Sequence, residues 1–248
     1  MTTVKNIYDY INTFAPFDTQ EEWDNSGFLL GDFRKEVKRA VLSLDASKSA
    51  ALFAKSVGAD LLLTHHPVIF GGVKEIKKGS ALYELVNADI AVISAHTSFD
   101  RAIDGINYNL ASILGLKNVK NIDGTFIVTA QLENEMSIDD FAVYVSECLD
   151  CHGLRYTDSE NMIKTVALGG GACAEYIPQA MANADCFLTG DLKYHEMLDA
   201  SEEGFPVISA GHFETENRPF LMLKNKLEMI FTDVEFIEAP VENPVLEI

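Results

Sequence analysis

The sequence has no long apolar run and few basic residues, and each shortage excludes a class of protein. Its apolar stretches fall far short of the roughly 20 residues that span a bilayer, and its first residues lack the basic and apolar regions of a secretion signal. Lys and Arg number 19 against 38 Asp and Glu, and the formal charge of -19 disfavours contact with a phosphate backbone. We therefore expect a globular, soluble, cytoplasmic protein that does not bind membranes. Nucleic-acid binding is disfavoured, and a DNA-binding role would require a locally basic central hole.

Cysteines are also scarce, and the four present are expected to be reduced thiols. Cys148, Cys151 and His152 match the C-x-x-C-H pattern of c-type haem attachment, but that attachment requires export. The same segment has the pattern of an amphipathic helix that follows an N-cap at Ser137 and ends at Gly153. The helix is the interpretation that the sequence favours.

An internal duplication relates two parts of the chain. Both copies contain a strand end, a small-residue turn, a helix and an Ala-Asp pair before the next strand, although few residues are identical. The matching segments are 43–66 with 168–191, and the repeated VISA at 92–95 with 207–210. Each copy alternates short Val, Ile and Leu runs with helical patterns, which is typical of βαβ units.

The duplication predicts an α/β fold of two similar lobes, with mostly parallel sheets flanked by helices. We expect one lobe at about 1–120 together with the C-terminal segment, and the other at about 121–216. The remaining patterns predict helices at 3–14, 104–116, 137–151 and 217–230, and strands at 124–133, 162–169 and 234–237.

Histidines lie where the predicted strands end, and such ends form the sites of α/β sheets. His65 and His66 follow the run LLLT, His96 follows the first VISA, and His212 follows the second. Pro67 has no N–H for a strand ladder and pushes His66 toward extended or turn geometry. The strand is therefore expected to stop at the pair, so that both imidazoles can face one crevice.

The pair His65 and His66, together with His212 and two carboxylates, supplies three imidazoles and two acids. This set suits zinc, iron, manganese or nickel better than calcium or magnesium, which prefer oxygen alone. Five ligands are too many for one tetrahedral site with an open position, and they suit two divalent ions about 3.5 to 4 Å apart. Spacing alone does not choose among the carboxylates, which are Asp100, Asp191, Glu214 and Glu216. Asp191 and Asp45 are also placed to cap helices, and capping is the favoured role of Asp45.

The ordered motifs EWDNSG, THHPVIF, AHTSFD, GDLKYHE and GHFETE resemble those of the Nif-three-like family, which includes type 2 GTP cyclohydrolase I homologues. The resemblance runs from about Trp23 to Glu216, and AHTSFD departs mildly from the usual AHTNLD or AHTSLD. It implies a toroidal homohexamer with dinuclear metal centres facing an internal cavity. The chain lacks the inserted domain of longer relatives, so no function of that domain carries over.

The resemblance also implies roles for single residues. It places His96 and His195 beside the metals, where they would transfer protons, contact phosphate or orient ligands. Trp23 and Asn25 would shape the cavity wall. The implied metal ligands are His65 on one ion, His66 and Asp100 on the other, His212 alongside His65, and Glu216 on both.

Two hypotheses of function follow. The first is a dinuclear metal-dependent hydrolase acting on a phosphate ester or a purine nucleotide, with GTP as the substrate that the resemblance implies. The second is a non-catalytic, metal-binding hexameric scaffold or regulatory interaction protein, because a fold and a metal site do not by themselves imply a reaction. An acidic chain can still hold a small anionic substrate if metal ions reverse the local field.

Overall fold

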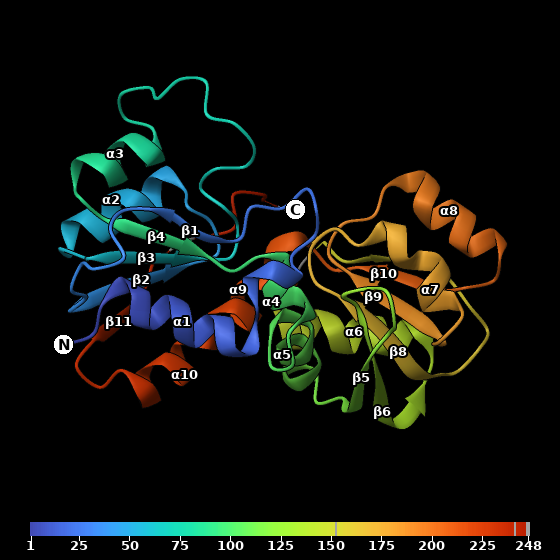
Figure 1. The fold of residues 1–248 in the computed structure, drawn as a ribbon. Helices are drawn as coiled ribbons and strands as arrows, with labels where there is room; N and C mark the ends of the chain where they lie inside the picture. The colour runs from blue at the N-terminus through green and yellow to red at the C-terminus, as the bar shows by residue number, and fades with distance from the viewer. Residues whose placement is uncertain (152, 241, 247–248) are drawn as a thin grey trace. The chain divides into compact units, whose positions relative to one another are not determined.

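The computed structural model describes residues 1–151, 153–240 and 242–246, so that His152 of the C-x-x-C-H pattern lies outside the described residues. The chain forms two compact units, each built around its own sheet (Figure 1). Unit 1 comprises Met1–Ile103 and Phe220–Glu242, and unit 2 comprises Asp104–Pro219 and Asn243–Ile248.

Unit 1 contains a five-stranded sheet in which three of the four neighbouring pairs are parallel. Its strands, in spatial order, are β1 (Gly27–Leu30), β4 (Ala91–Ser94), β3 (Leu61–Thr64), β2 (Arg39–Ser43) and β11 (Glu235–Glu238). Thr64 pairs with Ser43 on one side and with Ser94 on the other. Because the three strands end level, the residues that follow them meet at one edge of the sheet.

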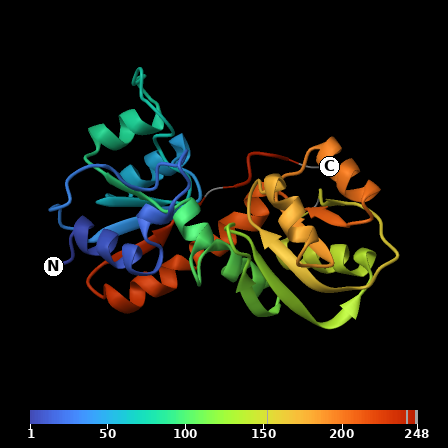
Figure 2. The ribbon, with the colours of Figure 1, turned by 45° about the vertical axis from the view of Figure 1, so that its right-hand side comes forward.

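Helices cover both faces of this sheet, with α2 and α3 on one face and α1 and α10 on the other (Figures 1 and 2). Alanines of α2 and Leu85 of α3 pack on Val41, Leu62 and Val92 of the central strands. The helices of unit 1 are α1 (Val4–Phe14), α2 (Lys48–Ser56), α3 (Ala81–Asn87), α4 (Thr97–Arg101) and α10 (Leu223–Ile230), with a 3-10 turn η1 (Phe17–Thr19).

Unit 2 contains a six-stranded sheet with a parallel centre and antiparallel margins. Its strands, in spatial order, are β5 (Lys117–Asn121), β6 (Val128–Met136), β8 (Ile163–Gly169), β9 (Cys186–Thr189), β10 (Val207–Ser209) and β7 (Arg155–Tyr156). Thr189 pairs with Gly169 and with Ser209. The three central strands of unit 2 therefore also end level.

Alternate residues of the central strands face two different cores, as expected for strands buried on both sides. Leu168 and Leu188 pack with the helices α5 and α6, whereas Ala167 and Phe187 pack on the side of α7 and α8. The helices of unit 2 are α5 (Ile106–Ile113), α6 (Ile138–Leu149), α7 (Ile177–Met181), α8 (Tyr194–Glu202) and α9 (His212–Leu221), with a 3-10 turn η2 (Ala174–Tyr176). α9 continues across the unit boundary at Pro219.

The α/β fold with two sheets flanked by helices is confirmed. Parallel pairing predominates in unit 1, whereas three of the five pairings in unit 2 are antiparallel. The first unit boundary follows Ile103 rather than residue 120, because Leu110 and Ala111 of α5 pack in the core of unit 2.

One helix begins earlier than predicted. The sequence indicated a helix at 217–230, but α9 already begins at His212 and a second helix, α10, begins at Leu223. Gly211, at φ +92°, makes the turn between β10 and α9. The polar residues of the first turn of α9 concealed its helical pattern in the sequence, and the site depends on that turn.

The segment with the C-x-x-C spacing forms the predicted helix. In α6 the Ser137 side chain accepts a hydrogen bond from the Asp140 N–H at 3.1 Å. None of the four cysteines, all within the described residues, takes part in a disulfide. No helix in the described part of the chain is both long and apolar enough to cross a bilayer.

Candidate metal centre

Three imidazoles gather at the carboxyl ends of β3 and β4 in unit 1. The ring of His65 lies 5.0 Å from the rings of His66 and of His96, and the latter two rings lie 5.4 Å apart. Each ring offers a ligand atom within 4.8 Å of those of the other two. These three residues are called the imidazole cluster below.

The adjacent histidines share the cluster because the strand has ended before them. The N–H groups of His65 and His66 both donate to the Leu44 carbonyl, at 3.1 and 3.0 Å. The hydroxyl of Thr64 donates to the His66 carbonyl at 2.8 Å and closes the turn. The alternation of a strand would have sent the two rings to opposite faces, and this turn removes the alternation.

Each imidazole of the cluster is oriented through the same nitrogen. Nδ1 of His65 lies 2.7 Å from the Ala95 carbonyl, and a carbonyl oxygen can only accept, so this nitrogen carries the proton. Nδ1 of His66 lies 2.7 Å from Oδ1 of Asp45, and Nδ1 of His96 lies 2.8 Å from Oδ1 of Asp24. A ring held in this way presents Nε2 as its ligand atom, the arrangement found around metal-binding histidines.

A buried carboxylate completes this part of unit 1. Asp100 lies on α4, is 4% exposed, and places Oδ1 3.6 Å from Nε2 of His65. Burial of a carboxylate is costly unless a positive charge or hydrogen bonds compensate it. The structure thus brings four of the predicted residues together in unit 1, namely His65, His66, His96 and Asp100.

Unit 2 presents a second pair of predicted ligands on the first turns of α9. His212 and Glu216 are four residues apart and lie on one face of the helix, with Nε2 of His212 3.1 Å from Oε2 of Glu216. Nδ1 of His212 lies 2.7 Å from Oδ2 of Asp191, so this imidazole is oriented as the other three are. Glu216 is 3% exposed. These two residues are called the helix pair below.

A glycine turn fits against the helix pair. Gly171 follows β8, has φ +67°, and a Cβ at this position would clash with Oε1 of Glu216 and lie 3.2 Å from Nε2 of His212. A Cβ on Gly170 would likewise lie 3.3 Å from Cγ of Glu216. Only glycine leaves the space that the carboxylate fills. The sequence showed this stretch merely as a small-residue turn, since its φ angles and its neighbours are properties of the folded chain.

Two carboxylates have roles other than helix capping. The capping role expected of Asp45 is wrong, because Ser47 is the N-cap of α2 and Asp45 bonds to His66 instead. Asp191 is not a cap either, since Lys193 precedes α8 as its N-cap. Glu214 accepts a hydrogen bond from Nδ2 of Asn243 at 2.7 Å.

Replacing Asp45 by Asn should lower metal affinity about 10- to 100-fold, because the amide is a weaker acceptor for the His66 N–H and holds the ring less firmly. Titration of metal-free protein with zinc against a competing chelator measures the effect. Asp9→Asn, which removes an exposed carboxylate that forms an ion pair with Lys5 on the same helix, is the control. Equal affinities for both variants would show that Asp45 does not orient a ligand.

Asp24 is a site residue that the sequence interpretation did not single out. Its side chain is fully buried, and its carboxylate also accepts hydrogen bonds from the Thr97 N–H at 3.0 Å and the Ser26 hydroxyl at 2.8 Å. Burial alone would raise the pKa of Asp24, but these hydrogen bonds and the charge of His96 outweigh it and hold the pKa well below its usual range. Asp24 lies in the EWDNSG motif, but no sequence pattern links it to His96.

The other predicted site residues differ in their surroundings. Trp23 is 57% exposed with its ring 5.7 Å from that of His96, and Asn25 donates to the Ile69 carbonyl at 2.7 Å. His195 lies exposed on α8 with its ring 5.3 Å from that of Tyr194, and it makes no hydrogen bond or ion pair among the described residues. Its role beside a metal stays a prediction.

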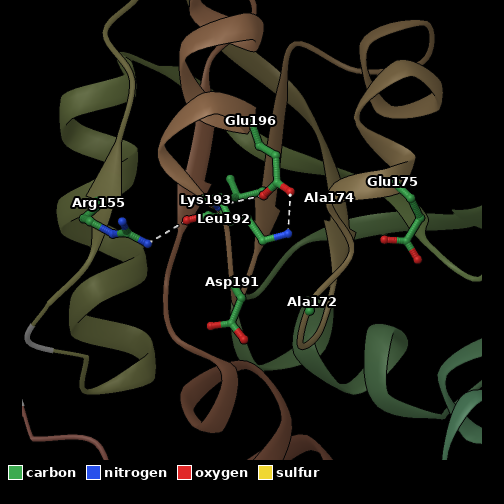
Figure 3. A pocket seen from close by; sticks show the side chains of 8 residues that line it. All are labelled: Arg155, Ala172, Ala174, Glu175, Asp191, Leu192, Lys193 and Glu196. Carbon is green, nitrogen blue, oxygen red and sulfur yellow. Dashed lines mark hydrogen bonds and ion pairs between the residues drawn. The ribbon is translucent and has the colours of Figure 1, made fainter.

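Asp191, the hydrogen-bond partner of His212, lines a cavity of about 460 Å³ in unit 2 (Figure 3). Arg155 also lines this cavity, and its Nη2 donates to the Leu192 carbonyl at 2.9 Å. The ammonium of Lys193 lies 3.5 Å from the Glu196 carboxylate, so the charges on the wall are mixed. The carboxylate that orients His212 is therefore reachable from open space.

His212 is held in its charged form when no cation is bound. Desolvation alone would lower the pKa of this ring, but hydrogen bonds to Asp191 and Glu216 and the charges of both carboxylates raise it to about 10. A metal would have to displace that proton, since a coordinating imidazole nitrogen is unprotonated.

The raised pKa predicts a pH-dependent stability of the metal-free protein. The pKa of His212 in the folded protein exceeds its value of about 6.5 in the unfolded chain. The charged imidazole therefore contributes its full stabilisation below about pH 6.5, and this contribution is lost as the pH rises through about 10. The unfolding temperature of chelator-treated protein should therefore fall from pH 7 to pH 10 more steeply than that of His212→Asn. Parallel curves for the two proteins would contradict the assignment.

The donor set fits divalent transition metals. Imidazole nitrogens and carboxylate oxygens at buried or half-buried positions suit zinc, iron, manganese or nickel. Glycine at 171 leaves room for the Glu216 carboxylate beside His212. The described residues thus include buried His, Asp and Glu groups able to bind a metal ion.

Comparison with known proteins places these features in a family. Residues 2–244 match the model of the family described as Duf34/NIF3 (NGG1p interacting factor 3). A GTP cyclohydrolase 1 type 2 homolog from Campylobacter jejuni is 34% identical over 219 residues, covering 86% of this chain and 87% of that protein. A protein of the same name from Clostridium perfringens is 31% identical, and the match covers 94% of this chain and 95% of that protein. The crystal structure of a hypothetical protein from Staphylococcus aureus superposes with a TM-score of 0.92 at 27% identity, covering 99% of each chain.

Proposed function

The chain belongs to the Duf34/NIF3 family, and from this premise we propose that it is a dinuclear metal-dependent hydrolase acting on a phosphate ester or a purine nucleotide. One observation carries the proposal. Four imidazoles on two units each have Nδ1 fixed by an oxygen acceptor, and a buried carboxylate lies beside one ring in each unit. Repetition of this arrangement is expected of a metal centre and has no evident use in packing.

We propose that the ligands of unit 1 and the helix pair complete a single centre, since neither set alone supplies enough ligands for two ions. The motifs support this, because their resemblance to the family assigns His65, His66, Asp100, His212 and Glu216 to one dinuclear centre.

Two bound divalent ions would lower the pKa of a water and offset the negative charge of a phosphate. The chain itself would orient those ions through His65, His66 and His212, and balance their charge with Asp100 and Glu216. Water is partly excluded there, because His65, Asp100 and Glu216 are almost fully buried.

His96 is the residue best placed to move a proton. Its Nδ1–H is bonded to Asp24, so Nε2 can take a proton from an attacking water and pass it to a leaving group. Asp24 would stabilise the imidazolium formed in between, as the acid of a catalytic triad does. His195 stays a proposed contact of the substrate phosphate.

The relatives' names favour a nucleotide as the substrate, since both are called homologues of GTP cyclohydrolase 1 type 2. We propose that the substrate of this chain is likewise a small anionic nucleotide and that the protein acts in the cytoplasm. We also propose a toroidal homohexamer, so native mass spectrometry should give about six times the chain mass of 27.4 kDa. A monomeric mass at micromolar concentration would contradict the ring.

A non-catalytic scaffold is the second candidate, favoured by the words "interacting factor" in the description of the family. In that case the metal centre would stabilise a surface for a partner protein. The scaffold predicts a bound metal without turnover, and the hydrolase predicts both.

A paired assay separates the two. Metal-loaded protein is tested against phosphate monoesters, phosphodiesters and nucleoside triphosphates, and the same preparation is tested after removal of metal by a chelator. Hydrolysis that is lost on chelation and restored by adding metal supports the hydrolase. Equal rates before and after chelation would exclude a metal-dependent reaction, and a metal-loaded protein that hydrolyses none of the compounds would favour the scaffold.

A further inference from the structure

Two large aromatic side chains stand exposed beside the imidazole cluster. Trp23 is 57% exposed and Phe70 is 56% exposed, although both are apolar surfaces that a chain normally buries. Their ring centroids lie 5.9 Å apart with an angle of 30° between the planes. The two rings, called the aromatic pair below, lie 5.7 and 5.8 Å from the ring of His96.

Two consecutive residues, Asp24 and Asn25, anchor the backbone that carries the aromatic pair. Asp24 bonds to His96 and Thr97, which anchors the backbone of its neighbour Trp23. Asn25 donates to the carbonyl of Ile69, which precedes Phe70. The backbone that carries each ring is therefore anchored, while more than half of each side chain stays exposed. Anchored, open rings are suited to accept a planar partner with little further ordering.

We propose that the aromatic pair is the binding subsite for the planar heterocyclic ring of the substrate, which stacks against Trp23 and Phe70. The proposal rests on the proposed function for the chemistry at the imidazole cluster. It adds that the substrate is recognised by a fused aromatic ring, such as a purine, and not by phosphate alone. Stacking tolerates different bases, because every base has a π-face.

The charges that follow Phe70 in the chain favour a nucleotide over other occupants. The exposed segment that follows it carries Lys74, Lys77 and Lys78 in a chain whose net charge is -19. Lys77 pairs with Glu75 at 2.8 Å, whereas Lys74 and Lys78 form no ion pair among the described residues. Exposed aromatic rings, followed in the chain by lysines that form no ion pair among the described residues, match a ligand with a flat ring and a negative tail.

The only tryptophan of the chain is Trp23, so its emission reports on this subsite alone. Guanosine and adenosine, which lack phosphate, are titrated into metal-free and metal-loaded protein with excitation of tryptophan and correction for absorbance. Both nucleosides should change the emission saturably, with or without metal. Ribose 5-phosphate, which lacks the ring, should not.

Variants then separate stacking from other effects. Trp23→Ala should weaken nucleoside binding about 5- to 100-fold in equilibrium dialysis, the range of base stacking measured by alanine substitution, and Trp23→Phe should weaken it less. Phe70→Ala retains the reporter and should shift its titration to higher concentration. Met229→Ala, which removes a 72% exposed apolar side chain elsewhere in unit 1, should leave binding unchanged.

The outcomes distinguish this subsite from the proposed function. Saturable binding of nucleosides without hydrolysis of any nucleotide would retain the subsite and remove the hydrolase. Hydrolysis with no saturable change of emission, or with equal change caused by ribose 5-phosphate, would overturn the subsite alone. A drop in native mass for Trp23→Ala would show that a second copy of the chain covers the rings, and would overturn it as well.

Discussion

Alanine at His65 should remove bound metal and hydrolytic activity together. The side chain is fully buried, its Nδ1 is fixed on the Ala95 carbonyl, and its Nε2 lies 3.6 Å from Asp100. Loss of a residue that merely orients a ligand costs 10- to 100-fold in affinity or activity, so loss of a ligand should cost at least about 100-fold. Metal content by elemental analysis and the rate on the preferred substrate measure the two effects.

Glu216→Ala, in unit 2, should also lose both bound metal and activity. This variant provides a second test if His65→Ala folds poorly. His195→Ala is the contrasting variant, because this exposed residue is expected to affect turnover while the metal is retained. Circular dichroism of each protein establishes that it is folded. A folded His65→Ala protein with the metal content of the wild type would contradict the assignment of this ligand.

Alanine at Gly171 should displace the Glu216 carboxylate without altering any of the proposed ligand residues. The new Cβ would clash with Oε1 of Glu216, and the carboxylate can relieve the clash only by leaving its position beside His212. Position 171 also has φ +67°, a left-handed conformation that costs about 1–2 kcal/mol for a residue with a Cβ. We expect metal affinity to fall by at least about 100-fold, as for loss of a ligand, measured by titration against a chelator.

Gly204 provides a matched control for the cost of placing alanine in a left-handed backbone conformation. It has φ +72°, and a Cβ there would meet nothing within 4 Å. Gly204→Ala should therefore lose a similar amount of stability in thermal unfolding but keep its metal. If the two variants lose metal equally, the effect at Gly171 arises from general destabilisation and not from the Glu216 carboxylate.

The sequence predicted the positions of the imidazoles better than their partners. His65, His66 and His96 follow β3 and β4 because parallel strands end at one edge of a sheet, a rule that needs no coordinates. The partners Asp24 and His96 are 72 residues apart, and no local pattern joins them. The sequence therefore indicated where these imidazoles gather, but it did not indicate Asp24, the acid that orients the proposed proton-transfer residue.

The error at Asp45 has a similar cause. An aspartate shortly before a helix is a common cap, but the hydroxyl of Ser47 caps Ala50 in α2, which leaves Asp45 for His66. Which of these two roles Asp45 takes depends on where the ring of His66, 21 residues later in the chain, lies in the folded protein. Likewise, spacing did not show that His212 and Glu216 lie on a helix, although their separation of four residues is the spacing of neighbours on one helix face.

Metal stoichiometry tests most directly whether the oriented imidazoles and buried carboxylates of both units hold a pair of divalent ions, as we propose. Elemental analysis is performed on wild-type protein purified without added metal, and again after loading with zinc or manganese and extensive dialysis. We predict two ions per chain after loading, and fewer in both His65→Ala and Glu216→Ala. A wild-type protein that retains no ion after dialysis, or retains the same number as both variants, would contradict the account.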